Sequence, residues 1–305
     1  MRSGFVAVVG RPNVGKSTLV NKMVGTKVAI TSARPNTTRH RILGVLHDED
    51  ADAQVVFVDT PGIHRPRSAL GTRLNETATD ALAEVDVVMA VVDATAAVGP
   101  GDRTVLERSV RHLHQAATRA GPDAAEHVPG LVVAVNKIDR ATPERLLERL
   151  AEAKEAVDAL GETSGVEYFP VSARTGQGVR ELTAHLIGRL PEGPPFFPSD
   201  VVTDTPEALW IAELVREQLL AKTRDELPHA ITCRVTEWEG SFIRVEIIVE
   251  RDSQKAIVIG KGGEILKQVG TAVRQQLPEG TYLDLHVKVE RHWQNREEML
   301  DRLGY

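Results

Sequence analysis

One segment, Gly10 to Ser17, constrains this chain more than any other. It reads GRPNVGKS and matches in full the phosphate-binding pattern GxxxxGK[ST]. An apolar run, Phe5 to Val9, precedes it, and a helix-compatible stretch, Thr18 to Val24, follows it. In a strand-loop-helix context of this kind, backbone N–H groups and a helix N-terminus can hold a phosphate. The segment therefore predicts a nucleotide-binding α/β domain.

Each residue type in this loop has a chemical reason. The glycines let backbone N–H groups turn toward a β-phosphate, Lys16 brings a cation to the β- and γ-phosphates, and the Ser17 hydroxyl can ligate Mg²⁺. A glycine-rich turn without these flanks could be merely structural. We expect nucleotide contacts from the whole loop and the residue after it: Gly10, Arg11, Pro12, Asn13, Val14, Gly15, Lys16, Ser17 and Thr18.

A second motif, Asn136-Lys137-Ile138-Asp139, predicts which base is bound. It follows the continuous apolar run Leu131 to Val135, which suits a buried parallel strand. Open α/β sheets bind ligands at the carboxyl ends of their strands, so the Asp139 carboxylate can accept from both guanine N1–H and the exocyclic amine. Adenine offers no such pair of donors and would leave the carboxylate unpaired. Taken alone, the four residues could form a surface turn; after a strand and a phosphate loop they favour guanine.

Two further segments also follow strand-like runs. Val55 to Val58 leads into Asp59-Thr60-Pro61-Gly62, where the carboxylate can hold Mg²⁺ through water and the Gly62 N–H can reach a γ-phosphate. Pro and Gly also favour an ordinary turn, so this reading depends on the motifs occurring together. Tyr168 to Val171 leads into Ser172-Ala173-Arg174, whose small residues would let backbone N–H groups approach guanine O6.

The proline-rich stretch Pro191 to Pro198 marks a domain break, because four prolines in eight residues forbid a continuing helix or a central strand. We predict a nucleotide-binding domain over residues 1–190, a linker over 191–199 and a second domain over 200–305. Phe196 and Phe197 are expected to pin the two domains together.

The second domain has the predicted order α-β-β-α-α-β. We expect a helix over 205–222, strands over 229–238 and 241–250, two helices joined at Gly260-Lys261-Gly262-Gly263 with the second over 264–276, and a strand over 283–289. This order resembles a KH domain of the bacterial, type II arrangement, in which a GxxG turn clamps a single-stranded RNA backbone. A lone GxxG turn is more often a helix connection. The surrounding order favours RNA, with Lys255 and Lys267 beside the turn.

The charge of this domain must be weighed against RNA binding, because residues 200–305 carry more acidic than basic side chains. The local balance differs. Between residues 251 and 274, five bases outnumber two acids: Arg251, Lys255, Lys261, Lys267 and Arg274 against Asp252 and Glu264. Such a focused patch suits a short single-stranded RNA better than a duplex, and we expect no DNA partner. Further on, Trp293 is read equally well as a stacking surface or as a buried anchor.

The composition is that of a two-domain protein of the cytoplasm. The chain has 305 residues, of which 42% are apolar, enough for two cores. No stretch approaches the roughly 20 apolar residues of a membrane span, and we expect no secretory signal, because the first residues run straight into the expected first strand. The single cysteine, Cys233, excludes an internal disulfide and a CxxC metal site.

Together these motifs resemble a translation-factor-class GTPase. The segment TSARPNTTRHR at residues 31–41, the DTPG form of the second motif and the C-terminal half narrow the resemblance to the Era family of bacterial ribosome-assembly GTPases. It covers nearly the whole chain. The resemblance implies a P-loop GTPase domain with a mostly parallel, doubly wound sheet, followed by an α+β KH domain. It also implies Thr38, or alternatively its neighbour Thr37, as the switch threonine that senses Mg²⁺ and the γ-phosphate.

The resemblance further supplies the metal set and the target. Ser17, Thr38 and Asp59 are the implied Mg²⁺ ligands. The implied partner is the 3′ end of 16S rRNA in the maturing 30S subunit, with peripheral contact to the inner membrane. No basic amphipathic helix supports that membrane contact.

The expected reaction is Mg²⁺-assisted attack of water on the GTP γ-phosphate, with Lys16, Thr38, Gly62 and Asn13 as its catalytic group. Signalling GTPases usually carry a water-orienting glutamine after this motif, but here the position is Ile63. We therefore expect help from K⁺, held by Asn13 as in similar cation-activated GTPases, or from the ribosomal partner. Two other readings are an ATP-using P-loop enzyme, disfavoured by the NKID motif, and an RNA-binding scaffold with a structural nucleotide site.

Overall fold

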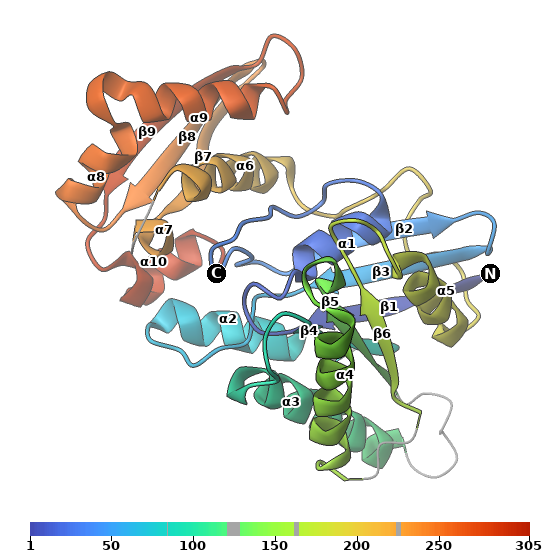
Figure 1. The fold of residues 1–305 in the computed structure, drawn as a ribbon. Coiled ribbons are helices and arrows are strands. Elements are labelled where there is room, and N and C mark those ends of the chain that lie inside the picture. The colour runs from blue at the N-terminus through green and yellow to red at the C-terminus, as the bar shows by residue number, and fades with distance from the viewer. Residues whose placement is uncertain (84, 121–128, 162–164, 224–226) are drawn as a thin grey trace. The chain divides into compact units, whose positions relative to one another are not determined.

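The computed structural model describes residues 1–83, 85–120, 129–161, 165–223 and 227–305 (Figure 1). Contacts among them define two compact units. The first contains Met1–Ala29, Thr38–Arg65 and Arg73–Asp204, and the second contains Ile30–Thr37, Pro66–Thr72 and Thr205–Tyr305. Two short stretches from the N-terminal half therefore group with the C-terminal unit, which the order of the sequence does not indicate.

The first unit is built on a six-stranded sheet with the order β2-β3-β1-β4-β5-β6. Only the edge strand β2 runs antiparallel; the other neighbours pair in parallel. The central strands are buried on both faces, which explains their continuous apolar runs. The strands are β1 (Arg2–Val9), β2 (Ile42–Asp48), β3 (Ala53–Asp59), β4 (Val87–Asp93), β5 (Gly130–Asn136) and β6 (Glu167–Val171).

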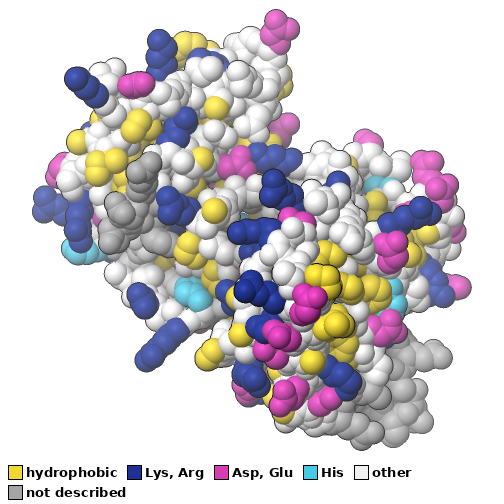
Figure 2. Space-filling model, viewed as in Figure 1, with side chains coloured by type: hydrophobic (Ala, Val, Ile, Leu, Met, Phe, Trp, Pro, Cys, Tyr) yellow, Lys and Arg dark blue, Asp and Glu magenta, His cyan; other side chains and the backbone are white. Residues whose placement is uncertain are grey.

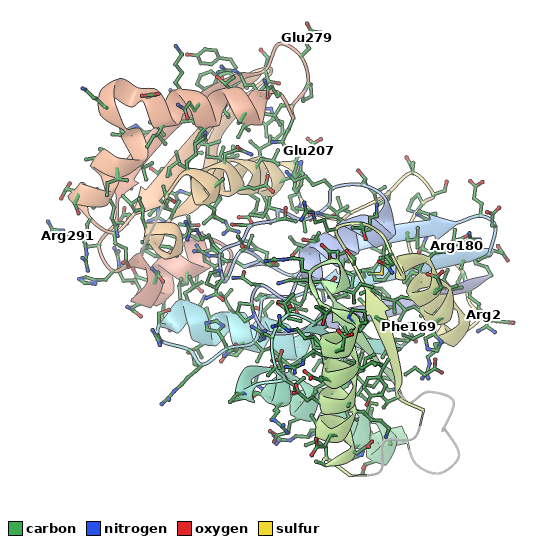
Figure 3. All side chains as sticks on the ribbon, viewed as in Figure 1. Arg2, Phe169, Arg180, Glu207, Glu279 and Arg291 are labelled. Carbon is green, nitrogen blue, oxygen red and sulfur yellow. The ribbon has the colours of Figure 1, made fainter. Side chains whose placement is uncertain are left out.

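Helices cover both faces of this sheet, and side chains fill the space between them (Figures 1 and 3). Helices α1 (Lys16–Val24) and α5 (Val179–Arg189) share one apolar cluster with the sheet. Helices α2 (Ala69–Asp80), α3 (Pro100–Ala120) and α4 (Pro143–Asp158) contribute to the cluster on the opposite face. This is the doubly wound arrangement predicted for a P-loop domain, and it brings the carboxyl ends of the parallel strands to one edge.

The proline-rich stretch packs on the first unit. The buried Gln54 side chain of β3 accepts from the backbone N–H groups of Phe196 (2.7 Å) and Phe197 (3.1 Å) and donates to the Phe197 carbonyl. The Phe196 ring meets the Phe5 ring of β1 edge-on at 4.7 Å. The two phenylalanines therefore anchor the proline-rich stretch to this sheet; their role in pinning the two domains together stays a prediction.

The second unit contains the expected α-β-β-α-α-β order. Its three strands pair as β7-β8-β9, with β7 antiparallel and β9 parallel to β8. The strand expected from residue 229 begins at Thr232, because a short helix comes first. The elements are α6 (Glu207–Lys222), α7 (Leu227–Ala230), β7 (Thr232–Glu239), β8 (Phe242–Val249), α8 (Asp252–Ile259), the 3-10 turn η3 (Lys261–Gly263), α9 (Glu264–Arg274), β9 (Tyr282–Val289), η4 (Trp293–Asn295) and α10 (Glu297–Arg302).

Trp293 is a buried anchor. Its side chain is fully buried, and its indole N–H donates to the Ala230 carbonyl at 2.9 Å. A buried indole normally finds such a partner. The stacking alternative for this residue is therefore excluded.

Among the described helices, none is long and apolar enough to cross a membrane.

Candidate functional site

The phosphate loop takes a shape that requires its glycines. Gly15 has φ +98°, and a Cβ there would lie 2.4 Å from the Asn136 amide nitrogen. Gly10 passes so close to β4 that a Cβ would lie 2.7 Å from the Val91 carbonyl oxygen. Lys16 is buried, and its ammonium donates to the Gly10 carbonyl at 3.1 Å. The loop thus encloses the cation that the sequence assigned to the phosphates.

Three oxygen-bearing side chains converge beside this loop. Ser17 Oγ donates to Asp59 Oδ2 at 2.6 Å, and the Ser17 and Thr38 hydroxyl oxygens lie 2.8 Å apart. Asp59 Oδ1 is buried, and no donor within the described part of the chain bonds to it. Hydroxyl and carboxylate oxygens are the donors that Mg²⁺ prefers. This donor set, with its orphaned carboxylate oxygen, fits the predicted metal site.

Burial shifts both charged groups of this site toward neutrality. Desolvation lowers the pKa of Lys16 from 10.5 to about 8, although the nearby Asp59 opposes the shift. Desolvation also raises the pKa of Asp59 from 3.8 to about 6, against the opposing effects of Lys16 and of the Ser17 hydrogen bond. Each charge therefore lacks the solvation that a bound phosphate or divalent cation would replace.

Asn136 joins three loops through one buried side chain. Its Nδ2 donates to the Val14 carbonyl at 2.8 Å, while its Oδ1 accepts from the N–H groups of Lys137 (2.8 Å) and Ala173 (2.9 Å). Val14 lies in the phosphate loop, and Ala173 lies after β6. Asn136 therefore links the walls of the site through its own hydrogen bonds; its predicted contact with the nucleotide stays a prediction.

The predicted base-reading carboxylate is exposed and oriented. Asp139 lies in the 3-10 turn η2 (Ile138–Arg140) directly after β5, and its Oδ1 accepts from the Ser172 hydroxyl at 2.7 Å. Ser172 itself is buried, whereas Arg174 is exposed beside it. The loop after β6 thus holds Asp139 in place at the edge where the strands end.

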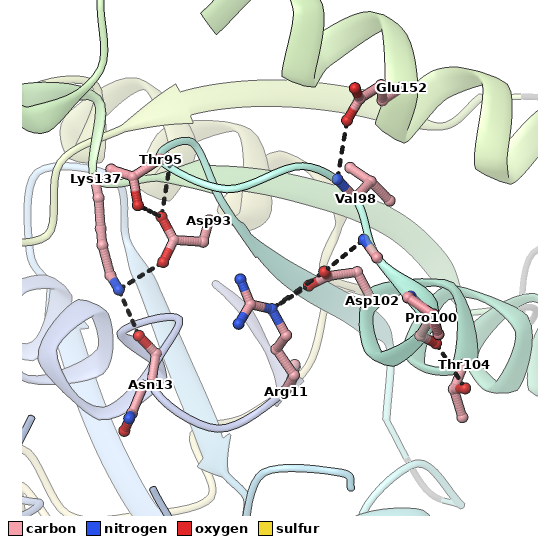
Figure 4. Close-up of polar contacts among 12 residues, drawn as sticks. Arg11, Asn13, Asp93, Thr95, Val98, Pro100, Asp102, Thr104, Lys137 and Glu152 are labelled. Carbon is pink, nitrogen blue, oxygen red and sulfur yellow. Dashed lines mark hydrogen bonds and ion pairs between the residues drawn. The ribbon is translucent and has the colours of Figure 1, made fainter. Parts of the chain in front are cut away.

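Figure 4 shows two acidic residues that the sequence analysis did not single out. Asp93 accepts from the Lys137 ammonium at 2.7 Å, and that ammonium also donates to the Asn13 carbonyl at 2.5 Å. Asp102 of α3 accepts from Arg11 Nε at 2.9 Å. Asp93 ends the apolar strand β4 just as Asp59 ends β3, a signal that could have found it. The Asp102 pairing joins distant segments and has no local signal.

The segment after Asp59 lies tightly against the phosphate loop. A Cβ at Gly62 would lie 2.6 Å from the Pro12 nitrogen, and the Ile63 N–H donates to the Gly10 carbonyl at 3.2 Å. Thr60 turns inward, donating from its hydroxyl to the Val8 carbonyl at 2.8 Å. Only a glycine at position 62 allows this approach.

The GxxG turn of the second unit has its two middle residues exposed and a positive φ at each of its three glycines. Gly260, Gly262 and Gly263 have φ of +77°, +62° and +79°. A Cβ at Gly262 or Gly263 would meet nothing within 4 Å, so the two positions are open on the outside. Lys261 and Lys267 are exposed, and Lys255 is half-buried. Figure 2 shows Lys and Arg side chains gathered at the edge where α8 lies, and Figure 3 shows Arg291 projecting outward there.

A phosphate loop of this geometry on a parallel sheet, followed by a unit of this topology, defines a P-loop GTPase with a C-terminal KH domain. The family model described as "50S ribosome-binding GTPase" matches residues 5–137, and the KH domain model matches residues 226–294. GTPase Era of Mycolicibacterium paratuberculosis is 46% identical over 100% of this chain and 99% of its own length. The chain belongs to the Era family of GTPases.

Other relatives and solved structures agree. GTPase Era of Mycobacterium tuberculosis is 46% identical over 99% of this chain and 98% of its own length. A point variant of Aquifex aeolicus Era bound to GDP·AlF₄⁻ is 37% identical, with a TM-score of 0.88 and coverage of 100% of this chain and 99% of that one. An Era complex with MgGDPNP and nucleotides 1506–1542 of 16S ribosomal RNA is 38% identical, with a TM-score of 0.86 and the same coverage.

Proposed function

We propose that this GTPase is a switch that binds the 3′ end of 16S rRNA and assists maturation of the 30S subunit. The observation that carries the switch is the convergence of Ser17, Thr38 and Asp59 beside the phosphate loop. Thr38 belongs to a loop distant in sequence from the other two, so a ligand that engages all three orders that loop. The RNA target is proposed from the relative crystallised with a 16S rRNA fragment.

In this proposal the residues of the chain place charged and polar groups around the phosphates and form no covalent bond with them. Mg²⁺, when bound at this site, would supply positive charge that offsets the negative charge developing on the phosphates. Ser17, Thr38 and Asp59 would hold this ion, and the Lys16 ammonium, enclosed by the loop, would bind the β- and γ-phosphates. The Gly62 N–H would donate to the γ-phosphate, because Gly62 lies directly against the phosphate loop at Pro12. Asp139, held by Ser172, selects guanine.

Water activation needs a group beyond these residues. The side chain at position 63 is an isoleucine only 2% exposed, which can neither donate nor accept a hydrogen bond. We propose K⁺ held by Asn13, whose side chain points away from the Lys137 contact made by its backbone carbonyl (Figure 4). Turnover should then be faster in KCl than in NaCl at equal ionic strength. Equal rates would exclude the cation and leave the ribosomal partner to supply the missing group.

RNA binding is assigned to the GxxG turn with Lys255, Lys261 and Lys267. Glycines let a phosphate backbone approach closely, and the N-terminus of α9 directly after Gly263 favours negative charge. The bases around the turn then add an electrostatic contribution that should weaken with salt.

The central experiment measures binding of a labelled RNA matching the 3′ end of 16S rRNA in the presence of GDP, a non-hydrolysable GTP analogue or an ATP analogue. Tighter binding in the GTP-analogue state, with no ATP effect, is the expected result. Binding indifferent to the nucleotide would contradict the switch. It would favour the alternative reading of an RNA-binding scaffold with a structural nucleotide site.

We place this activity in the cytoplasm, where small subunits mature. Peripheral contact with the inner membrane rests on the family resemblance alone. Co-sedimentation of the purified protein with anionic vesicles tests it, and absence of the protein from the vesicle pellet would exclude direct lipid binding.

A further inference from the structure

The first helix of the KH unit carries a buried ion pair. Arg216 of α6 is fully buried, and its guanidinium donates from Nε to Glu213 Oε1 at 2.7 Å. The Glu213 side chain is only 5% exposed. Burying two charges costs hydration free energy that offsets much of their mutual attraction, so a contribution to packing does not by itself explain this ion pair. Its further hydrogen bonds indicate what it is for.

Those bonds reach residues 30–37, which lie far away in sequence but group with this unit. Arg216 Nη2 donates to the Thr37 carbonyl. At the other end of the segment, Glu217 accepts from the Thr31 N–H at 2.9 Å. Ile30 is buried in the apolar cluster of the KH unit. Helix α6 therefore holds both ends of this loop with buried or half-buried groups.

The residue after this loop is Thr38, whose hydroxyl lies 2.8 Å from Ser17 Oγ in the candidate metal site. The Thr37 carbonyl that Arg216 binds belongs to the same rigid, planar peptide unit as the Thr38 nitrogen. A guanidinium that fixes this carbonyl therefore restricts where the Thr38 backbone can lie. Its planar fork can hold Glu213 and the carbonyl together, which a single ammonium does less well.

We propose that Arg216, held by Glu213, is a positioning residue for GTP hydrolysis: it fixes the Thr37–Thr38 peptide so that the Thr38 hydroxyl is delivered to Mg²⁺ and the γ-phosphate. This inference rests on the proposed function, because it takes Thr38 as the residue that engages them. It gives the KH domain an indirect part in the GTPase reaction, through the Thr37–Thr38 peptide, separate from its part in binding RNA.

The test replaces the pair by two leucines, Glu213→Leu with Arg216→Leu, which removes the donor without leaving a buried charge. GDP lacks the γ-phosphate, so its affinity should stay within about twofold of wild type. The turnover number should fall about tenfold, the factor that one hydrogen bond from a charged donor is worth. The Mg²⁺ concentration that gives half-maximal turnover should rise. A merely structural role would not separate GDP binding from turnover.

The matched control is Arg234→Leu with Glu246→Leu, which removes another ion pair of the same unit, between β7 and β8. Its turnover should equal that of wild type. RNA binding in the GDP state serves as the measure of whether the KH unit of each variant is folded. If the leucine pair at 213 and 216 prevents folding, Arg216→Lys is the second variant; it keeps a counter-charge for Glu213 and should show a smaller loss in the same direction.

Wild-type turnover and Mg²⁺ dependence in a folded Glu213→Leu/Arg216→Leu protein, or in Arg216→Lys when that is the variant used, would overturn the inference. The nucleotide dependence of RNA binding in the wild-type protein separates this result from failure of the proposed switch. If wild type shows that dependence and the variant retains normal turnover, the switch stands and Arg216 is not its positioning residue.

Discussion

Replacing Asn136 by alanine should destabilise the GTPase domain and weaken GDP and GTP binding by the same factor. The substitution removes three hydrogen bonds, to the Val14 carbonyl and from the Lys137 and Ala173 N–H groups. It removes them at a position that is 1% exposed. Both nucleotides share the phosphate loop and the base edge that this side chain joins, so neither should be favoured.

The size of the effect follows from the geometry. Each of the three bonds is worth about 1 kcal/mol net, so their loss costs about 3 kcal/mol of unfolding free energy. Water cannot easily replace them, because Val14 and Ala173 are buried. For a unit of this size the melting temperature should fall by about 10 °C.

The assay is thermal and urea unfolding without nucleotide, followed by titration with GDP and a GTP analogue. The matched control is Asn75→Ala, another buried asparagine, which bonds the His64 carbonyl (2.6 Å) and N–H (3.2 Å) away from the base edge. It should also lose stability, with a much smaller effect on GDP affinity. If Asn136→Ala unfolds like wild type yet loses guanine affinity, the main role of Asn136 is direct contact with the base, and the stabilising role assigned to its three hydrogen bonds is wrong.

Three further predictions address the phosphate, metal and RNA sites. Lys16→Ala should weaken GTP-analogue binding by more than about tenfold with the fold retained, because Lys16 is the buried ammonium that the loop encloses. Titration and circular dichroism measure this, and unchanged affinity would contradict the assignment. In the wild-type protein, the affinity for a GTP analogue with Mg²⁺ should be highest between about pH 6 and 8. Above pH 8, Lys16 of the nucleotide-free protein loses the proton that gives it the positive charge the phosphates need. Below pH 6, Mg²⁺ must displace a proton from Asp59. Titrations from about pH 5 to 9.5 check this, and a flat profile would refute it. Gly262→Asp should weaken RNA binding about tenfold by placing a carboxylate at the clamp, while GDP affinity stays unchanged; intact RNA binding would remove the clamp from the GxxG turn.

The sequence predicted the fold where the signal is local. Apolar runs such as Leu131 to Val135 became buried parallel strands, because both faces of the sheet are covered by helices. The order of elements in the KH domain was likewise predicted from local patterns in the sequence. The strand expected at residue 229 starts later because helix α7 precedes it, and helix ends are set by nearby packing that a pattern does not contain.

What the sequence could not give are pairings between distant segments. It named Asp59 and Ser17 as metal ligands from their motifs, but their 2.6 Å bond depends on how β3 lies beside the phosphate loop. Arg11 gave no sign of its partner Asp102, 91 residues away. Thr38 was identified only through the family resemblance, because a pair of threonines has no local signature.

The grouping of residues 30–37 with the KH unit makes the coupling between nucleotide and RNA a matter of linkage. If Arg216 holds the loop in the form that Thr38 needs for GTP, then GTP must in turn stabilise that form of the loop against α6. An RNA that binds this form of the KH unit more tightly then binds more tightly in the presence of GTP. GTP in turn binds more tightly in the presence of that RNA, by the same factor, because coupling free energies are reciprocal. The ratio of RNA affinities with GTP analogue and GDP must therefore equal the factor by which RNA shifts preference between those nucleotides. A coupling of about 1–3 kcal/mol, typical of such linkage, corresponds to roughly 5- to 150-fold in either direction. Removing the Arg216 contact should reduce this coupling, and linkage then requires both ratios to fall by the same factor.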